Sequence, residues 1–274
     1  TQPAGQGATV EFRFRNGNKV SFEAHAIRVE KLLDDVKAYL KGNPKQVNWN
    51  DVNLGDIGYR LVTEGGEKYI ADKVANWNLD LKPRPHHFDR RITVTTPLQK
   101  AGAYLVTARM ADGNTSRIII WGADTLIARK PLAGKMLHYV ADAVTGEPIP
   151  KANLEFFGWS WRRTPKNQQE IVTHNFAEFT NADGQVIPQE VPADKAKDTS
   201  GWQWLITARK DGRLAYLGFT YTWGGAYHDA EYNQAKVFVI TDRPVYRPKQ
   251  TVKFKFWVRH AKYDQADASS FAGQ

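Results

Sequence analysis

A repeated segment at an interval of 100 residues most constrains the fold of this chain. Residues 105–109 (LVTAR) are echoed by residues 205–209 (LITAR), and each copy runs on into an Asp-Gly pair, at 112–113 and at 211–212. Asp-Gly between alternating apolar runs is a strong hairpin signal, so each copy predicts the closing hairpin of a unit. A period of this size suits tandem immunoglobulin-like β-sandwiches, whose usual length is about 100 residues. Two hairpins within one large domain is the alternative that the repeat leaves open.

The composition agrees with a β fold. The chain has 274 residues, of which 42% are hydrophobic and 12% aromatic, and many of the aromatic residues lie in alternating runs. Such runs favour strands over helices, and the length suggests about two domains. We therefore expect an all-β protein of tandem sandwiches with units at 1–128 and 129–234 and the first strands of a third at 235–274.

The first unit combines short strands with one helix. Strands are expected at Thr9–Arg15, Lys19–Ala24, Ile57–Thr63, Tyr69–Ile70, Trp77–Leu81 and Ile92–Thr95. Between them, residues 28–41 carry apolar side chains at helical spacing, and Gly42 and Pro44 end the run. This pattern predicts an amphipathic helix, whose apolar stripe we expect to cover the core of its own unit rather than to bind a partner.

Two turn signals organise the second unit. Residues 142–152 (DAVTGEPIPKA) read as the first hairpin of a β-sandwich module, with Thr-Gly and Pro forming the turn. Residues 181–186 (NADGQV) read as a later hairpin turn. Both support a sandwich without specifying an activity.

The segment 241–252 (TDRPVYRPKQTV) separates an apolar strand at 237–240 from an alternating strand at 253–258. Each proline fixes its own φ and favours an extended residue before it, so we expect a straight spacer between the strands. Because a sandwich would then begin here, we expect the chain to end inside a third unit. The strand 253–258 should have an open edge that pairs with a neighbouring molecule.

This segment resembles the opening of a macroglobulin domain of the alpha-2-macroglobulin family, especially its bacterial members. The residues that carry the resemblance are Thr241, Asp242, Arg243, Pro244, Tyr246, Arg247 and Pro248. Lys249 stands where that family usually has Gly, so this turn either avoids a positive φ or is strained by it.

The resemblance implies a function for the intact protein. It implies a broad-spectrum protease trap made of macroglobulin domains, exported to the periplasm or the cell surface, in which this chain is a non-catalytic scaffold that contacts other macroglobulin domains. The targets would be proteases. The family's Cys-x-x-Gln thioester cannot lie in this sequence, which contains no cysteine.

The sequence offers no candidate catalytic, metal-binding or cofactor-binding residues. His86 and His87 are neighbours that would point to opposite sides of an extended chain, and Asp34 and Asp35 are about 100° apart on a helix. A Gly-x-Ser-x-Gly elbow, a phosphate-binding loop and a dinucleotide fingerprint are all missing from the sequence. We expect no enzyme activity and no cofactor.

Two tryptophan pairs allow another reading. Trp159 and Trp161, like Trp202 and Trp204, are two residues apart and would share a strand face. Exposed, Trp159 and Trp161 could stack on sugars, so a carbohydrate-binding module is the alternative, together with an adhesin-type surface array. Trp204 is expected in the core because Tyr104 occupies the same place in the repeat.

The net charge of +9 raises nucleic acid or an anionic surface as a partner. Lys and Arg are dispersed and alternate with apolar residues, and no nucleic-acid motif accompanies them, so we expect no nucleic-acid partner. No stretch approaches the roughly 20 apolar residues of a membrane helix, and direct membrane insertion is not expected.

Overall fold

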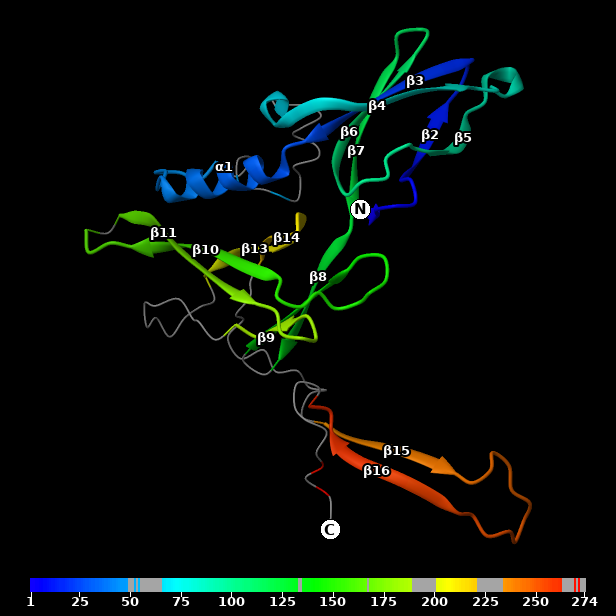
Figure 1. Cartoon of the computed structure of the whole chain (residues 1–274), viewed down its shortest axis with the longest axis vertical. Coiled ribbons are helices and arrows are strands. Elements are labelled where there is room, and N and C mark those ends of the chain that lie inside the picture. The colour runs from blue at the N-terminus through cyan, green and yellow to red at the C-terminus, as the bar shows by residue number, and fades with distance from the viewer. Residues whose placement is uncertain are drawn as a thin grey trace.

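The computed structural model describes residues 1–48, 52, 54, 66–132, 135–166, 168–188, 201–220, 234–262, 269 and 271. The strands are β1 (Gln2–Pro3), β2 (Thr9–Phe14), β3 (Lys19–Ile27), β4 (Ile70–Asp80), β5 (Arg90–Thr95), β6 (Gly102–Met110), β7 (Thr115–Ala123), β8 (Thr125–Leu132), β9 (Lys135–Asp142), β10 (Asn153–Arg163), β11 (Gln169–Phe179), β12 (Gln185–Val186), β13 (Gln203–Lys210), β14 (Arg213–Thr220), β15 (Ala235–Thr241) and β16 (Phe254–His260). One α-helix, α1 (Val29–Lys41), and two 3-10 turns, η1 (Gly66–Tyr69) and η2 (Pro85–His87), complete the described elements. The expectation of an all-β chain with a single amphipathic helix in its first unit is confirmed (Figure 1).

The first sandwich consists of a five-stranded sheet, in the order β1-β7-β6-β3-β4, and the two-stranded sheet β2-β5. Alternate residues of the strands meet in one core. The core includes Val10 of β2, Phe22 of β3, Val94 of β5 and Val106 of β6. The predicted closing hairpin is present, with β6 and β7 paired from Gly102 to Arg109.

The second sandwich packs the four-stranded sheet β11-β10-β13-β14 against the three-stranded sheet β12-β9-β8. Its core contains Val140, Leu154, Phe156 and Trp204, all fully buried. The second closing hairpin, β13-β14, is also present. The location of Trp204 in this core confirms the expectation drawn from the repeat.

The change from the first sandwich to the second falls at Asp124. Strand β7 ends at Ala123 in the first sandwich, and β8 begins at Thr125 and pairs with β9 in the second. The boundary expected at residue 128 falls within β8, and we propose Asp124 as the boundary between the two units. A single residue between two strands leaves the chain little freedom at this junction.

The turn at residues 142–152 is present, and it closes a short antiparallel pairing in which Ala141 forms a bridge with Pro148. Backbone N–H groups of Val144 and Thr145 donate to Asp142 Oδ1, and Gly146 adopts a φ of 76°. However, β9 before the turn pairs with β8 and β12, whereas β10 after it pairs with β11 and β13. The expected hairpin is therefore short, and beyond it the segment carries the chain from one sheet to the other.

The second turn signal likewise leads from one sheet to the other. The backbone N–H of Asn181 donates to the Gln185 carbonyl at 2.9 Å, and Asn181 Oδ1 accepts from two backbone N–H groups of the turn. Strand β12 beyond it pairs with β9 rather than with β11. The turn expected at residues 181–186 is therefore present, but the strand after it pairs with β9 and not with the strand before it.

Two expected strands of the first unit merge, and a third lies outside the described residues. The strands expected at Tyr69–Ile70 and Trp77–Leu81 belong to one long strand, β4, which pairs with β3 and contains a register shift near His25. Tyr69 itself ends the turn η1. The strand expected at Ile57–Thr63 lies outside the part of the chain that the structure describes.

The two last strands form an antiparallel hairpin. Thr241 pairs with Phe254 and Ala235 with His260, so the chain reverses between them. The expectation of a straight spacer is wrong, because the two prolines leave the residues around Lys249 free to turn. The turn Arg247-Pro248-Lys249-Gln250 closes with a hydrogen bond from Gln250 N to the Arg247 carbonyl, and Lys249 adopts a φ of 69°.

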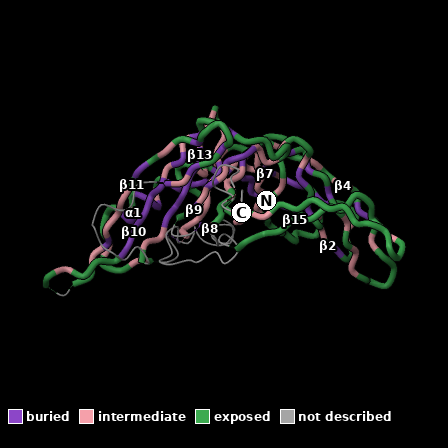
Figure 2. The backbone as a smooth tube through the Cα atoms, turned by 90° about the horizontal axis from the view of Figure 1, so that it is seen from below, coloured by how far each residue is buried: buried purple, intermediate pink, exposed green. Residues whose placement is uncertain are grey.

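Figure 1 shows this hairpin apart from both sandwiches, and Figure 2 shows β15 exposed along its length. Strand β16 pairs with β15 of the same chain. Pairing of its other edge with a neighbouring molecule stays a prediction.

Candidate functional site

Among the described residues, the best-defined candidate site is the interface between the two sandwiches, here named the joint. Helix α1 leaves β3 of the first sandwich and lies along β10 and β11 of the second (Figure 1). Its buried residues belong to a cluster that also contains residues of both large sheets. The helix covers apolar residues of its own unit, as expected, and it also covers residues of the second sandwich, which the expectation did not include.

The two copies of the repeat explain how this cluster forms. In each copy one residue enters the core of its own sandwich, Tyr104 in β6 and Trp204 in β13, while the next residue points the opposite way. These next residues, Leu105 and Leu205, both lie in the cluster under α1. A strand covered on both faces needs a continuous apolar run, which is what the repeated motif provides.

The apolar part of the joint is well packed. Leu33 and Leu40 of α1 are fully buried, as are Phe157 and Leu205 of the sheet beneath. Val36 and Leu32 fill the same stripe of the helix. Full burial of a Leu or Phe side chain contributes about 1.5–3 kcal/mol, so removal of this cluster from water is a major stabilising term for the joint.

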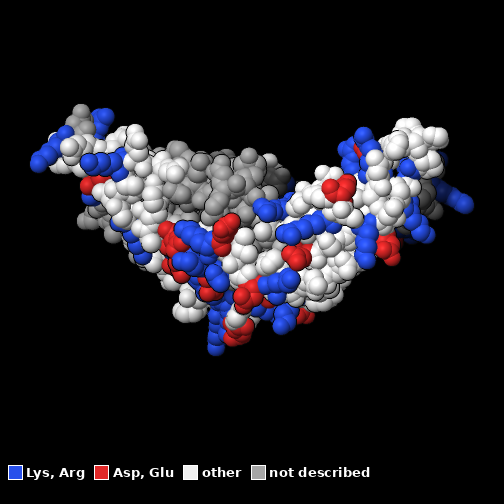
Figure 3. Space-filling view, turned by 90° about the horizontal axis from the view of Figure 1, so that it is seen from above, with Lys and Arg blue, Asp and Glu red and all other residues white. Residues whose placement is uncertain are grey.

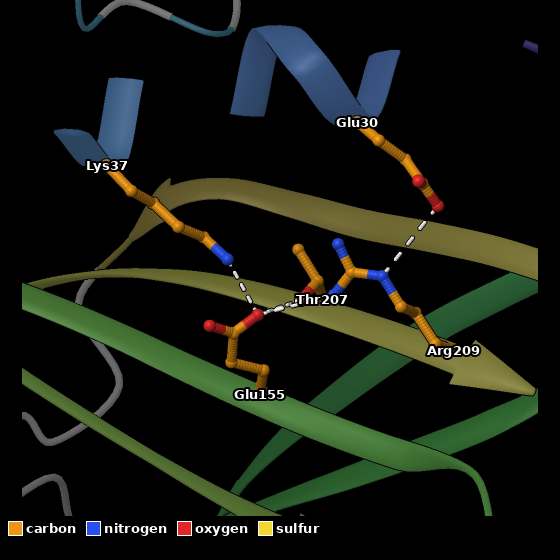
Figure 4. A network of polar contacts seen from close by, with 5 residues as sticks. All are labelled: Glu30, Lys37, Glu155, Thr207 and Arg209. Carbon is orange, nitrogen blue, oxygen red and sulfur yellow. Dashed lines mark hydrogen bonds and ion pairs between the residues drawn. The ribbon is translucent and has the colours of Figure 1, made fainter. Parts of the chain in front are cut away.

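A polar network lies beside the apolar cluster (Figure 4). Lys37 of α1 donates to Glu155 of β10, with 2.6 Å between Lys37 Nζ and Glu155 Oε2. Thr207 Oγ1 and Arg209 Nη1 of β13 donate to the same oxygen at 3.2 Å and 3.3 Å. Arg209 Nε in turn lies 3.9 Å from a carboxylate oxygen of Glu30, in the first turn of α1. The network thus starts and ends on the helix and passes through two strands of the other sandwich.

The charges in this network favour an ionised Glu155. Burial alone would raise the pKa of the Glu155 carboxyl, but the hydrogen bond and the charge of Lys37, with the charge of Arg209, outweigh burial and lower the pKa below its ordinary 4.5. The Lys37 side chain is only 9% exposed, and Glu155 is 22% exposed. A lysine buried to this degree needs its partner, so the pair fixes the rotation of α1 on the sheet.

The C-terminal end of α1 adds a backbone contact. Asn43, one residue beyond the helix cap, has a φ of 50°, and its side-chain carbonyl accepts a hydrogen bond from the Ile171 backbone N–H of β11 at 2.8 Å. Lys41 Nζ lies over the Phe157 ring, 5.7 Å from its centroid. Both ends of the helix are therefore attached to the second sandwich.

Trp159 and Trp161 do not form a sugar-binding platform. Trp159 is 2% exposed and belongs to the cluster under α1, while Trp161, further along β10, is 37% exposed. Their rings are nearly perpendicular, with 72° between the planes. The sequence placed both residues on one strand face, as found, but could not show that a helix covers half of that face.

The histidine and aspartate pairs do not converge on a site. His86 and His87 both adopt positive φ in η2, and the Nδ1–H of His87 donates to Asn16 Oδ1 at 2.8 Å. Asp35 bonds the Tyr69 hydroxyl and two lysines, as structural carboxylates do. Within the described residues there is no group of three or more His, Asp or Glu side chains arranged to hold a metal ion.

A cavity of about 340 Å³ opens between β2 and the β6-β7 turn, next to Gly17 and Met110. Arg13 and Arg15 on its wall both donate to Asp89, which lowers the pKa of that carboxyl to about 2. Two guanidinium groups against one carboxylate leave a net positive charge at this wall, and the cavity lining contains no His, Lys or Cys side chain.

The residues of the 241–248 motif hold the hairpin turn. The Tyr246 hydroxyl and the Lys253 backbone N–H donate to Asp242 Oδ1, and the side chain of Arg243 donates to Asp242 Oδ2. The Arg243 guanidinium also lies 5.6 Å from the centre of the Tyr246 ring. These contacts give the motif a structural role.

No protein-family model matches the sequence, and no curated protein matches it. One of the solved structures similar to this chain is native alpha-2-macroglobulin from Escherichia coli spanning domains NIE-MG1. The two share 18% sequence identity with a TM-score of 0.46, and the match covers 79% of this chain and 91% of that chain. The chain is similar to bacterial alpha-2-macroglobulins. A second Escherichia coli structure, spanning MG0-NIE-MG1, has 16% identity, a TM-score of 0.43, and coverage of 79% of this chain and 60% of that chain. A third, Salmonella alpha-2-macroglobulin reacted with methylamine, has 16% identity and a TM-score of 0.26 over 92% of this chain, which spans only 18% of that chain.

No helix in the described part of the chain combines the length and the apolar character that crossing a membrane requires.

Proposed function

We propose that this chain is a non-catalytic scaffold segment of an alpha-2-macroglobulin-like protease inhibitor, and that its own task is to hold successive sandwiches in a fixed relation. The observation that carries this proposal is the joint under α1, where both large sheets bury a second face and a buried ion pair links the helix to the next sandwich. An interface of this kind couples the position of one sandwich to the position of the next. A trap that rearranges around a protease requires such coupling between its domains.

The hairpin β15-β16 supports the wider proposal. Its motif at residues 241–248 resembles the opening of a macroglobulin domain. One face of the hairpin carries Val237, Val239, Thr241, Phe254, Phe256 and Val258, here named the apolar face, with the pair Ala235 and His260 at its end. We infer that this face is the inner surface of a third sandwich. The intact protein would then be exported to the periplasm or the cell surface, contact proteases as targets and contact its other macroglobulin domains through segments such as this one.

The alternative readings receive less support. A carbohydrate-binding module needs exposed coplanar indoles, and Trp159 is buried. An adhesin-type array would share the tandem sandwiches, and no specific feature of the described residues favours it.

The test uses the intact protein that contains this segment, incubated with trypsin. A trap is expected to leave trypsin active on a small chromogenic peptide and to suppress its activity on a large protein substrate. A Leu33→Ala variant should weaken that protection, while Lys31→Met, on the exposed side of α1, should not. Full trypsin activity on the large substrate, or hydrolysis of substrates by the protein itself, would overturn the proposal.

A further inference from the structure

The positive charge of the chain is concentrated on the β15-β16 hairpin. Seven Lys and Arg residues lie between positions 235 and 260 against one carboxylate, Asp242, which leaves this short segment with +6 of the total net charge of +9. Over the middle of the face seen in Figure 3, by contrast, Lys and Arg are interspersed with Asp and Glu. The scaffold role explains the turn motif and the apolar face of the hairpin, but not this charge.

The charge is combined with aromatic side chains on one side of the ribbon. The residues whose side chains lie opposite to the apolar face are Lys236, Phe238, Ile240, Lys255, Trp257 and Arg259, here named the cationic face. Phe238 is 63% exposed and Trp257 is 40% exposed. The centroids of the two rings lie 5.6 Å apart, and Lys255 Nζ lies 4.9 Å from the centre of the Trp257 ring.

The register of the hairpin places like charges opposite each other. Lys236 of β15 pairs directly with Arg259 of β16. Both side chains project from the same face of the ribbon, so the register brings two cationic groups together on that face.

The shape and chemistry of this face indicate the kind of partner. The face belongs to a projecting ribbon (Figure 1), whereas the described cavity lies in the first sandwich. Because its strands are largely exposed, the ribbon can lie along an extended surface. Exposed Trp beside Lys and Arg is the combination that favours the headgroup region of membranes, and basic residues bind anionic lipid surfaces without shape complementarity.

We propose that the cationic face of the β15-β16 hairpin docks on an anionic phospholipid bilayer at the level of the headgroups. Lys236, Lys255 and Arg259 contact lipid phosphates, and Trp257 and Phe238 lie among the headgroups without crossing the membrane. This inference does not rest on the protease-trap proposal. It is also compatible with a third sandwich, because a sheet packed on the apolar face leaves the cationic face open.

The experiment measures binding of the 274-residue chain to vesicles by flotation. Vesicles contain either phosphatidylcholine alone or phosphatidylcholine with one third phosphatidylglycerol. Binding is expected only to the second kind and should fall as salt is added. Quenching by brominated lipid should be smaller in Trp257→Phe than in the unchanged chain.

Matched charge variants locate the surface. Lys236→Gln, Lys255→Gln and Arg259→Gln together should lower partitioning roughly a hundredfold, since each basic residue near an anionic surface strengthens binding about fivefold. Lys45→Gln, Lys82→Gln and Lys100→Gln together remove the same charge from exposed positions elsewhere and should lower it far less.

Equal losses in the two triple variants would overturn the proposal. So would the absence of binding to anionic vesicles at low salt, equal binding to neutral vesicles, or binding of the chain to DNA but not to vesicles.

Discussion

Lys37 and Glu155 are 118 positions apart in the sequence, and their charged atoms meet at 2.6 Å. The lysine belongs to the helix of the first unit and the glutamate to a central strand of the second. Neither residue stands out in the sequence, yet the pair shows which sandwich the helix binds.

Replacement of Lys37 should destabilise the chain. Lys37→Met leaves Glu155 partly buried with Arg209 and Thr207 as its remaining partners, and we expect a loss of about 1–2 kcal/mol, below the range for fully buried pairs because the carboxylate is still accessible to water. Urea denaturation at neutral pH measures this loss. Lys31→Met removes an exposed pair with Asp35 and should cost under about 0.5 kcal/mol. Equal effects of the two variants would show that the burial of Lys37 has no energetic consequence.

The same pair makes a pH prediction with a definite sign. The pKa of Glu155 is lower in the folded chain than in the unfolded one, so Glu155 contributes stability at pH values above its unfolded pKa, and this contribution is lost as the pH falls through the folded pKa. In Lys37→Met the depression should shrink, and the loss of stability on acidification below about pH 4.5 should be less steep. Unfolding free energies measured from pH 6 to pH 3 compare the two slopes, and identical slopes would contradict the assignment.

The apolar cluster should couple the unfolding of the two sandwiches. Leu33→Ala creates a cavity under α1 and should cost about 2–5 kcal/mol. Because Leu33 lies in the shared cluster, we also expect calorimetry to separate one unfolding transition into two. Leu154→Ala is the control, since Leu154 is equally buried but lies in the core of the second sandwich alone. A single transition in Leu33→Ala would indicate that the joint does not depend on this cluster.

The sequence predicted the elements well where the signal is local. Hairpins at 102–123 and 203–220 follow from an apolar run and an Asp-Gly turn, and α1 follows from the spacing of Val29, Leu33, Val36 and Leu40. The binding partner of α1 could not be predicted in the same way. An apolar helical stripe has the same pattern whichever sheet covers it, so the position of α1 on the second sandwich depends on contacts between residues far apart in sequence.

The burial of Trp159 was hidden for the same reason. Alternation placed Trp159 on the face of β10 that points away from the core of its own sandwich, where exposure would be the normal result. The uninterrupted apolar run at 156–159 is the signal that both faces are covered. Likewise, the two prolines of the 241–252 segment suggested a straight chain, whereas Asp242 and the positive φ of Lys249 create the reversal.

Gly158 should be required for the position of Trp204. A Cβ at Gly158 would lie 2.7 Å from the nearest ring carbons of Trp204, whose side chain is fully buried and has no room to move. We expect Gly158→Ala to cost about 1–3 kcal/mol through overpacking. Gly218→Ala in β14 is the control, because the nearest atom to its added Cβ would be 3.5 Å away. Chemical denaturation measures the free energy of unfolding of both variants, and equal values would contradict the steric argument.

His138 should make the second sandwich sensitive to acid. Its side chain is fully buried against the Phe156 ring, and burial, together with the charge of Arg129, lowers the pKa of the imidazole to about 4. The unfolded chain therefore binds this proton at higher pH than the folded chain, and stability falls as the pH drops from about 6.5 to about 4, by roughly 3 kcal/mol in total. His138→Phe should remove this part of the acid dependence, whereas His86→Asn in the exposed turn η2 should keep it. The same fall of stability with decreasing pH in both variants would show that groups other than His138 cause the acid sensitivity.

Lys249 tests whether the turn of the hairpin stores strain. A φ of 69° places a residue with a Cβ in the left-handed region, at the third position of a turn that favours glycine. Lys249→Gly relieves the steric cost but increases the freedom of the unfolded chain, so a net gain of about 0.5 kcal/mol is expected. Lys253→Gly, directly before the following strand and without a positive φ, carries the same change of side chain and should destabilise the hairpin instead. Hydrogen exchange of the β15-β16 amides measures both changes locally, and slower exchange in Lys249→Gly with faster exchange in Lys253→Gly is the expected pair of results. Faster exchange in both would mean that Lys249 adopts its positive φ without strain.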